Sequence, residues 1–254
     1  MKLKYIGLTD KGRVRDHNED SYLANGIIFT SLDRGGEESI TEIELYDSPL
    51  IFAVADGMGG HEGGEVASNM ALELLKEKLV SLPDKNTIEF IRNTFQEIHL
   101  EVLRMGREMD KNGMGTTLTG CIFCKTKFYV FNIGDSRVYR FRGDYIAQLT
   151  RDHSLREETG DESLQKNIIT SCIGGGIEEI RIDVTDFSSK ISENDLFFLM
   201  SDGIVDSLTD DDLEITFQTK DRSLGDMLRE VLELSLEKGS TDNVTGILIR
   251  ILGD

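Results

Sequence analysis

The sequence predicts an α+β protein with an antiparallel sheet at its core, and two observations favour this fold class. Short β-branched or aromatic strands arrive in hairpin-linked groups, and amphipathic helical segments bracket those groups. This grouping favours antiparallel pairing over a doubly wound parallel sheet. No segment of the 254 residues resembles a linker, so we expect a single domain over residues 1–254.

Three segments have the apolar periodicity of amphipathic helices. Residues 64–81 carry an apolar stripe that includes Ala67, Leu75 and Leu79, and residues 87–105 carry a similar stripe. The break around Pro83 predicts that these two helices form an antiparallel pair. A third helix is expected from Ser223 to Gly239, because glycine commonly ends a helix.

The strand pattern covers most of the remaining chain. Each predicted strand is short, and turns such as Arg142–Asp144 join neighbouring strands. The predicted strands are residues 50–55, 117–124, 127–133, 137–141, 145–150, 196–200 and 244–252.

Two regions are irregular. Residues 31–48 are acidic and weakly patterned, which is consistent with an exposed hairpin extension. Residues 151–176 form a second irregular segment, and loops of this length inside a compact domain are often functional lids.

The charge of the chain excludes several classes of partner. Lys and Arg total 28 against 47 Asp and Glu, which gives a formal net charge of -19. This charge argues against general binding to nucleic acid or to anionic membranes. The N-terminus has no apolar leader segment and no stretch is apolar enough to span a membrane, so we expect a cytoplasmic protein.

Three cysteines are too few for a disulfide framework in a chain of this length. Cys121 and Cys124 form a C-x-x-C, but they lie on a predicted strand, where residues three apart face opposite ways. We therefore expect ordinary buried thiols there and at Cys172, in preference to a zinc or redox site.

Acidic residues occur where predicted strands end or begin. Asp56, Asp135 and Asp202 each follow an apolar strand, and Asp242 comes just before one. In an antiparallel sheet the end of one strand lies beside the start of its neighbour. We therefore expect these four carboxyl groups to converge at one edge.

Three further acids strengthen this expectation: Glu19 and Asp20 precede an apolar segment, and Asp206 follows Asp202 by one turn. Carboxylates about 4 Å apart repel by about 1 kcal/mol per pair in water, and by about 4 kcal/mol at an effective dielectric constant of about 20. Such a cluster needs a cation, and oxygen ligands without His or Cys favour Mg²⁺ or Mn²⁺.

The glycines after Asp56 allow close backbone approach, so that the Gly57 carbonyl can serve as a ligand. Two hard cations bridged by an aspartate lower the pKa of water toward about 7 and hold both oxygens of an in-line displacement at phosphorus. Phosphoester hydrolysis is therefore the expected chemistry, and Arg15 can hold the phosphate in a bidentate grip.

Six motifs, in order, resemble the metal-dependent protein Ser/Thr phosphatases of the PPM family, also called type 2C. The motifs are VRDHNED, VADGMGGHEGGEVAS, GTTL, NIGDSRVYR, SDGIVD and TDNVT. The match extends from about Arg13 to Val244. It is most similar to the bacterial branch, in which Asp-Gly-Met-Gly-Gly-His is usual.

This resemblance implies a β-sandwich of two antiparallel sheets flanked by pairs of helices, in four layers, with a binuclear Mn²⁺ or Mg²⁺ centre at one end. It implies that Asp56 bridges the two ions, that the Gly57 carbonyl binds one, and that Asp202 and Asp242 bind the other. It further implies that Glu19 and Asp20 hold waters around the ions and that Arg15 binds the phosphate. A third ion is implied at Asp135 and Asp202, with Asp206 as a further candidate ligand.

The resemblance also implies a substrate class and leaves one role unassigned. Phosphorylated Ser/Thr proteins are the expected substrates, a Ser/Thr kinase is the expected counterpart, and a monomer is expected. Some eukaryotic relatives have a His, proposed as the general acid, where this chain has Met58. His17 and His153 are candidates for substrate-side contacts, whereas His61 and His99 are expected to be structural.

Rival functions fit the sequence less well. No cysteine begins the C-x₅-R of cysteine-based phosphatases, and no nucleotide P-loop is present. A two-metal nuclease conflicts with the charge of -19. A catalytically weak, phosphatase-like binding module would be expected to lack some of the acids or Arg15, and all are present. Dephosphorylation of an anti-sigma-factor antagonist stays an alternative within the fold.

Overall fold

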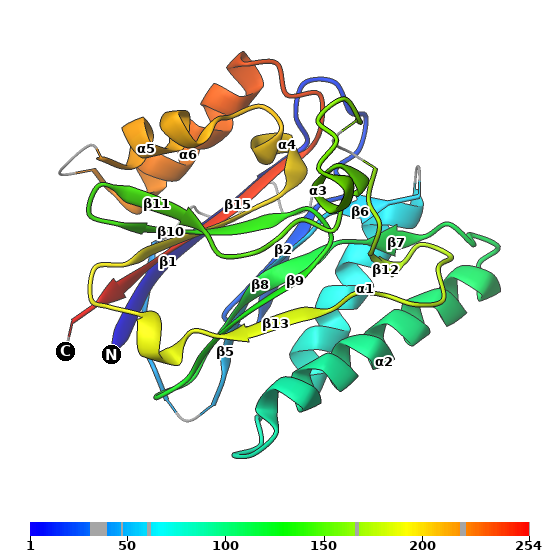
Figure 1. The fold of residues 1–254 in the computed structure, drawn as a ribbon, viewed down its shortest axis with the longest axis horizontal. Coiled ribbons are helices and arrows are strands. Elements are labelled where there is room, and N and C mark those ends of the chain that lie inside the picture. The colour runs from blue at the N-terminus through cyan, green and yellow to red at the C-terminus, as the bar shows by residue number, and fades with distance from the viewer. Residues whose placement is uncertain (31–39, 47, 60–61, 166–167, 219–221, 254) are drawn as a thin grey trace.

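Two six-stranded antiparallel sheets pack face to face, and helices cover both outer faces (Figure 1). This computed structural model describes residues 1–254 except 31–39, 47, 60–61, 166–167, 219–221 and 254. Helices α1 and α2 cover one face of the sandwich, and α4, α5 and α6 cover the other. The four-layer sandwich implied by the family resemblance is therefore confirmed.

The first sheet, sheet A, has the strand order β11-β10-β14-β15-β1-β4. At its centre β1 pairs with β15 over nine residues, from Lys2 opposite Leu252 to Asp10 opposite Val244. The strands of sheet A are β1 (Lys2–Asp10), β4 (Thr41–Glu44), β10 (Arg137–Arg142), β11 (Tyr145–Gln148), β14 (Leu196–Met200) and β15 (Val244–Leu252).

The second sheet, sheet B, has the order β13-β9-β8-β5-β2-β3, and a small third sheet has the order β12-β7-β6. The strands of sheet B are β2 (Ser21–Ala24), β3 (Ile27–Phe29), β5 (Leu50–Ala55), β8 (Leu118–Phe123), β9 (Phe128–Ile133) and β13 (Asp183–Asp186). The small sheet consists of β6 (Gly57–Met58), β7 (Gly115–Thr116) and β12 (Ile173–Gly174).

The three predicted helices are present as α1 (Glu62–Lys78), α2 (Thr87–Glu108) and α6 (Leu224–Glu237). Ser223 caps α6, because its hydroxyl accepts the N–H of Asp226. The sequence pattern did not identify the shorter helices, which are α3 (Leu155–Thr159), α4 (Asp202–Val205), α5 (Asp210–Gln218) and the 3₁₀ turn η1 (Ser188–Lys190).

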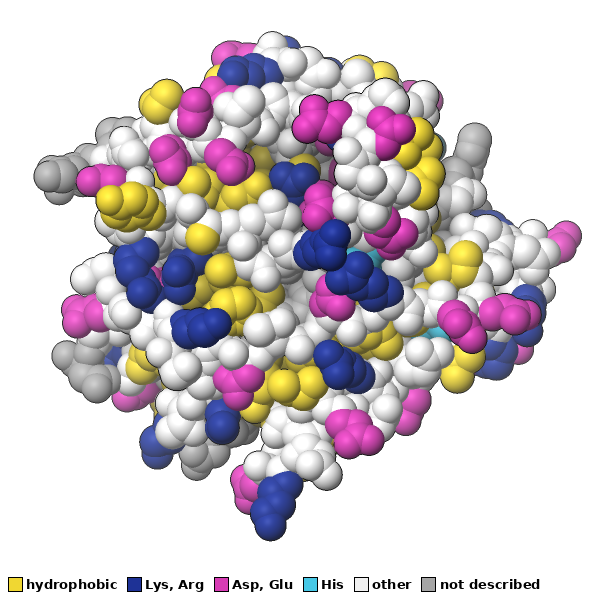
Figure 2. Space-filling model, viewed as in Figure 1, with side chains coloured by type: hydrophobic (Ala, Val, Ile, Leu, Met, Phe, Trp, Pro, Cys, Tyr) yellow, Lys and Arg dark blue, Asp and Glu magenta, His cyan; other side chains and the backbone are white. Residues whose placement is uncertain are grey.

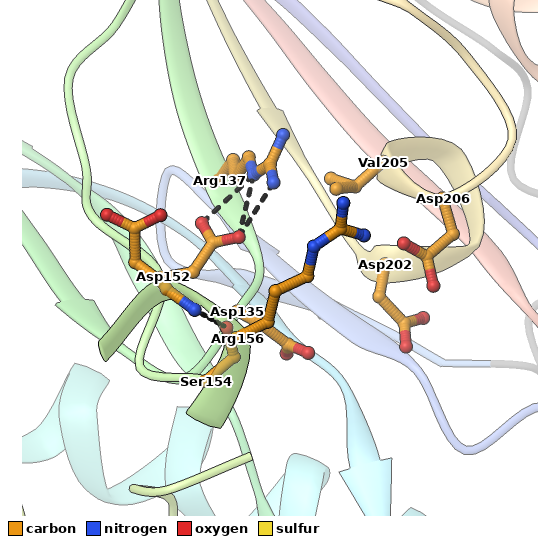
Figure 3. Close-up of a pocket in the computed structure, with 9 residues that line it drawn as sticks. Asp135, Arg137, Asp152, Ser154, Arg156, Asp202, Val205 and Asp206 are labelled. Atoms are coloured by element: carbon orange, nitrogen blue, oxygen red, sulfur yellow. Dashed lines mark hydrogen bonds and ion pairs between the residues drawn. The ribbon is translucent and has the colours of Figure 1, made fainter. Parts of the chain in front are cut away.

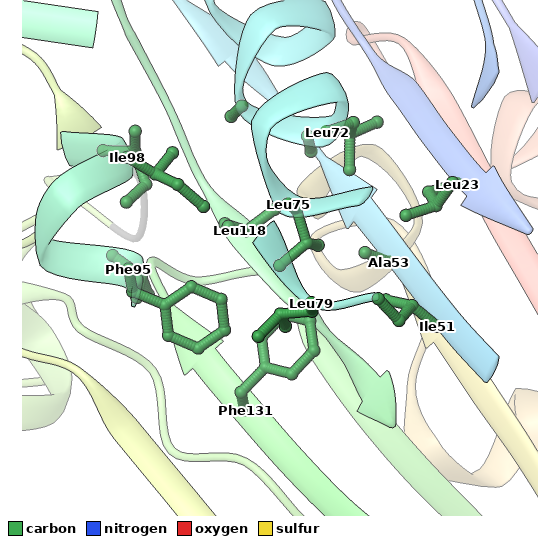
Figure 4. Close-up of a cluster of buried hydrophobic side chains, with 14 of the residues drawn as sticks. Leu23, Ile51, Ala53, Leu72, Leu75, Leu79, Phe95, Ile98, Leu118 and Phe131 are labelled. Atoms are coloured by element: carbon green, nitrogen blue, oxygen red, sulfur yellow. The ribbon is translucent and has the colours of Figure 1, made fainter. Parts of the chain in front are cut away.

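Buried apolar side chains form one cluster in each of the three spaces between layers. Leucines of α1 meet Phe95 of α2 and Phe131 of β9 on the outer face of sheet B (Figure 4). Phe52, Phe128 and Phe197 fill the space between the two sheets. A third cluster lies between sheet A and the helices α4 to α6.

All seven predicted strands are present, with ends that differ by at most two residues. The pattern missed β1, a central strand, because its Lys and Thr residues weaken the apolar pattern. In the 31–48 segment, residues 41–44 form β4 and pair with β1, whereas residues 31–39 and 47 lie outside the described residues. Cys121 is buried in the cluster between the sheets, whereas Cys124 is half-buried and packs on the opposite face of sheet B.

Acidic and basic side chains are interspersed over the face of the molecule that Figure 2 shows. Within the described residues, every helix is too short or too polar to cross a bilayer.

The layer between sheet B and its helices generates a stability prediction. Replacing Leu75 with Ala should lower the free energy of unfolding by about 2–5 kcal/mol, because Leu75 is fully buried between α1 and the sheet. The measurement is urea unfolding. Leu100→Ala on α2, where the side chain is 55% exposed, should change stability by less than about 0.5 kcal/mol; equal effects of the two substitutions would contradict the packing described.

Candidate metal centre

Four aspartates lie at strand ends on one edge of the sandwich. Asp56 and Asp135 come after β5 and β9 of sheet B, Asp202 comes after β14 of sheet A, and Asp242 precedes β15. Because β5 and β9 are both antiparallel to β8, they run in the same direction and end at the same edge. The end of β14 likewise lies beside the start of β15. We call the carboxyl groups gathered here the acidic rim: Glu19, Asp20, Asp56, Asp135, Asp202, Asp206 and Asp242.

Contacts to a neighbouring segment fix the backbone of Asp56. Its N–H donates to Thr117 Oγ1 at 3.0 Å, and its carbonyl accepts the Thr117 N–H at 2.9 Å. At the next residue, Gly57, a Cβ would lie 2.3 Å from the Gly64 carbonyl oxygen and 2.6 Å from the Glu19 carbonyl oxygen. Glycine at 57 therefore lets two other backbone segments approach Asp56 closely.

Neutral side chains hold Glu19 and Asp20 at the rim. Ser201 Oγ donates to Asp20 Oδ2 at 2.8 Å, and Asn243 Oδ1 accepts the Glu19 N–H at 2.9 Å. Ser68 Oγ of α1 donates to the Glu19 carbonyl at 2.7 Å. Since Ser201 and Asn243 are the sequence neighbours of Asp202 and Asp242, these bonds tie the first acidic motif to the last two.

Burial and mutual repulsion raise the pKa values of four rim carboxyl groups. Burial, the largest cause in each case, acts with neighbouring carboxylates to raise the pKa of Asp20 to about 7, that of Asp135 to about 8 and that of Asp202 to about 6. Burial and then the charges of these three groups and of Asp242 raise the pKa of Asp56 well above its ordinary value. The charges of Asp20, Asp135, Asp202 and Asp242 all act on Asp56 at this edge of the sandwich.

The donor set fits a hard divalent cation. Asp135 Oδ1 and Asp202 Oδ1 are buried and have no hydrogen-bond partner among the described residues, and such unpaired oxygens are costly. A cation would satisfy them and offset the repulsion, and an all-oxygen site favours Mg²⁺ or Mn²⁺. In the described part of the chain, no three acidic, His or Cys side chains are grouped as a ligand set for one ion, so ligation requires the rim side chains to turn toward a common point.

Arg15 lies at the rim and pairs with one of its acids. Its Nη2 donates to Asp242 Oδ2 at 2.5 Å, and the charges of Glu19 and Asp202 also act on it. The Arg15 side chain is 51% exposed. A cation with this exposure, next to the acids, can reach an anion that approaches from solvent.

A cavity of about 230 Å³ opens beside Asp135 and Asp202 (Figure 3). Arg137 forms a bidentate ion pair with Asp152 on one wall, with Nε and Nη2 at 2.9 Å and 2.7 Å from its carboxylate oxygens. Arg156 extends across the cavity toward the α4 side. The lining residues are Asp135, Arg137, Asp152, Ser154, Arg156, Glu157, Asp202, Val205 and Asp206.

Arg137, Asp152 and Arg156 were not predicted as cavity residues. Position in the sequence could have indicated two of them, because Asp152 and Arg156 belong to the irregular segment 151–176, which was expected to be a lid. The supporting residues Thr117 and Asn243 were also not predicted; both stand inside the family motifs but carry no charge.

The histidines have different surroundings. His17 is exposed, and His61 lies outside the described residues. His99 and His153 are fully buried, so His153 makes no substrate-side contact. Burial lowers the pKa of both buried imidazoles below the ordinary value of 6.5.

Comparison with known proteins identifies similar chains. The model of a family described as protein phosphatase 2C matches residues 41–248. The serine/threonine phosphatase stp of Listeria innocua is 35% identical over 256 residues, which cover 95% of this chain and 93% of that protein.

Solved structures are similar in fold as well. The serine/threonine phosphatase of S. agalactiae matches with a TM-score of 0.80 at 25% identity, over 98% of this chain and 99% of that one. The catalytic domain of the serine/threonine protein phosphatase PstP, solved in complex with two manganese ions, matches with a TM-score of 0.74 at 26% identity over the whole of both chains.

The raised pKa values predict how stability depends on pH without metal. The folded state keeps protons on Asp20 and Asp135 up to about pH 7 and about pH 8, whereas the unfolded chain releases them near 3.8. The folded state therefore binds more protons, and stability falls as pH rises, by up to about 1.4 kcal/mol per pH unit for each extra proton. In a chelator, the midpoint of thermal unfolding should fall between about pH 7 and 8.

Two comparisons make this measurement specific. Above pH 7 the imidazoles of His99 and His153 are mostly neutral in both states, so their opposite contribution is small. Mn²⁺ should raise the midpoint more at pH 8 than at pH 7, since it competes with protons. Asp135→Asn should reduce the slope in chelator; a midpoint that rises with pH in chelator would contradict the electrostatics described.

Proposed function

Since the chain belongs to the protein phosphatase 2C family and is a protein serine/threonine phosphatase, we propose that its acidic rim holds the divalent ions of the reaction. The observation that supports this most directly is the pair of buried, unpartnered oxygens on Asp135 and Asp202, beside acids whose pKa values are raised by one another. Burying so much like charge without a cation is unfavourable.

We assign the ligands as follows. Asp56 would be shared by two ions, the Gly57 carbonyl would hold one of them, and Asp202 and Asp242 would hold the other. Glu19 and Asp20 orient water at the centre, which their hydrogen bonds to Asn243 and Ser201 support. Asp135 and Asp202, with Asp206 as a further candidate, would hold a third ion on the cavity side.

The metal is Mn²⁺ or Mg²⁺ in this proposal, because the donors are carboxylate and carbonyl oxygens. The PstP catalytic domain, which this chain resembles over its full length, was solved with two manganese ions. When bound, such ions lower the pKa of water and offset the charge of the phosphoryl oxygens.

In this proposal different side chains bind the phosphate and the attacking water. Arg15 binds the phosphate of phosphoserine or phosphothreonine, and releasing Asp242 to the metal would free its guanidinium group for this contact. The rim carboxylates position the attacking water, and Asp20, buried with only 2% of its surface exposed, keeps a fixed orientation through Ser201. In this proposal water attacks phosphorus directly while the bond to the Ser or Thr oxygen breaks; the attacking water loses a proton and the leaving oxygen takes one up.

We further propose that the substrates are proteins phosphorylated on Ser or Thr by a Ser/Thr kinase; the relatives are named serine/threonine phosphatases. A single catalytic domain acting as a monomer is consistent with the continuous sandwich. The two faces of each sheet are covered within the chain itself.

The ligand assignment predicts the effect of one conservative substitution. Asp202→Asn keeps the size of the side chain but removes a charged ligand, and should reduce hydrolysis of an aryl phosphate in Mn²⁺ at least about 100-fold. Chelation should abolish the activity of the unmodified protein. Asp211→Asn, an exposed acid on α5 with the same change in charge, should keep full activity; turnover by Asp202→Asn at the unmodified rate would refute the assignment.

A further inference from the structure

His153 is a buried histidine that forms hydrogen bonds with the turn that contains Asp135. Its side chain is 0% exposed. Its backbone N–H donates to the Gly134 carbonyl at 2.9 Å, and its Nδ1 accepts the Gly134 N–H at 3.3 Å. The second ring nitrogen, Nε2, lies 3.1 Å from Asp183 Oδ2. His153 therefore binds both backbone polar groups of Gly134, the residue before Asp135.

These partners define the tautomer of the ring. A backbone N–H can only donate, so Nδ1 of His153 must be unprotonated. The proton is then on Nε2 and is donated to Asp183. Arg181 holds Asp183 in turn, with Nη2 at 2.8 Å from Oδ2. The chain of contacts thus runs from an ion pair at the start of β13, through the imidazole, to the Gly134 amide.

The backbone of this turn can adopt few other conformations. Gly134 has φ +119, a conformation that side chains disfavour, and a Cβ there would lie 2.6 Å from Thr117 Cγ2. Asn132 Nδ2 donates to the carbonyls of Gly134 and Arg151, at 2.9 Å and 2.8 Å. Thr117 also holds the Asp56 amide, so the turn is packed against the support of the bridging aspartate.

We propose that His153 is a positioning residue that, through Gly134, fixes the Asp135 carboxyl group for ligation of a divalent ion. The inference rests on the proposed function, in which Asp135 is a metal ligand. His153 touches neither metal nor substrate. It acts through the acceptor Nδ1, while the bond from Nε2 to Asp183 selects the tautomer in which Nδ1 can accept. Residues that orient metal ligands commonly contribute about 10–100-fold to metal affinity.

Two substitutions separate the two ring nitrogens. In His153→Asn the amide oxygen stands near the position of Nδ1 and can still accept the Gly134 N–H. In His153→Gln the amide nitrogen stands near the position of Nε2 and can still donate to Asp183, but the acceptor for Gly134 is lost. Each variant therefore keeps one of the two side-chain hydrogen bonds.

The readout is Mn²⁺ binding by calorimetry without substrate, together with thermal unfolding. His153→Gln should weaken the Asp135-dependent site about 10–100-fold, whereas His153→Asn should restore affinity to within about 3-fold of the unmodified protein. The midpoints of thermal unfolding should fall by similar amounts in both. Equal losses of affinity, or none in His153→Gln, would overturn the positioning role.

A double-variant cycle separates this inference from the proposed function. Asp135→Asn should remove the same Mn²⁺ site, and adding His153→Gln should then cost nothing further. An additive loss would mean that His153 acts on another ligand and would overturn the inference alone. Unchanged Mn²⁺ binding in Asp135→Asn would instead contradict the ligand assignment itself, and the inference with it.

One measurement needs no variant. Nitrogen NMR of the unmodified protein should find His153 neutral with the proton on Nε2, and its ring signals should shift when Mg²⁺ fills the Asp135 site. The opposite tautomer would contradict the contacts on which the inference rests.

Discussion

Repulsion among carboxyl groups gathered at one edge of the sandwich is the constraint on which the rest of the site depends. The chain brings Asp56, Asp135, Asp202 and Asp242 together from segments that only sheet pairing makes neighbours. Burial, and then this repulsion, raises the pKa values of Asp56, Asp135 and Asp202, which makes their charged forms unfavourable in the absence of a cation. The same cost is available as binding energy for an ion of opposite charge, because a metal relieves it.

The acids are supported mainly by neutral groups. Hydroxyl and amide side chains, such as Thr117, Ser201 and Asn243, hold the backbone or carboxyl groups of the rim. Such partners fix geometry without cancelling negative potential, so the rim still attracts a cation. Two arginines form ion pairs nearby: Arg15 with the rim acid Asp242, and Arg137 with Asp152 on the cavity wall.

Much of this could be predicted from the sequence, for identifiable physical reasons. Strands 50–55 and 244–252 were predicted at their observed ends because each is a dense apolar run, and Asp56 and Asp242 stand out at their termini. The strand β1 was missed because its Lys and Thr residues weaken the apolar pattern and its partner β15 is far away in the chain. Asn243 and His153 were not recognised as supporting residues, because a side-chain hydrogen bond to the backbone does not change the composition or the apolar periodicity of the sequence.

The central pairing of β1 with β15 has a consequence for how the protein folds during its synthesis. In sheet A, β15 lies between β14 and β1, so the sheet is two separate pieces until residues 244–252 join it (Figure 1). Contacts between such distant segments form late and slowly. A chain still emerging from the ribosome thus contains most of the rim acids, but the edge that gathers them is complete only after Asp242 and β15 have been synthesised.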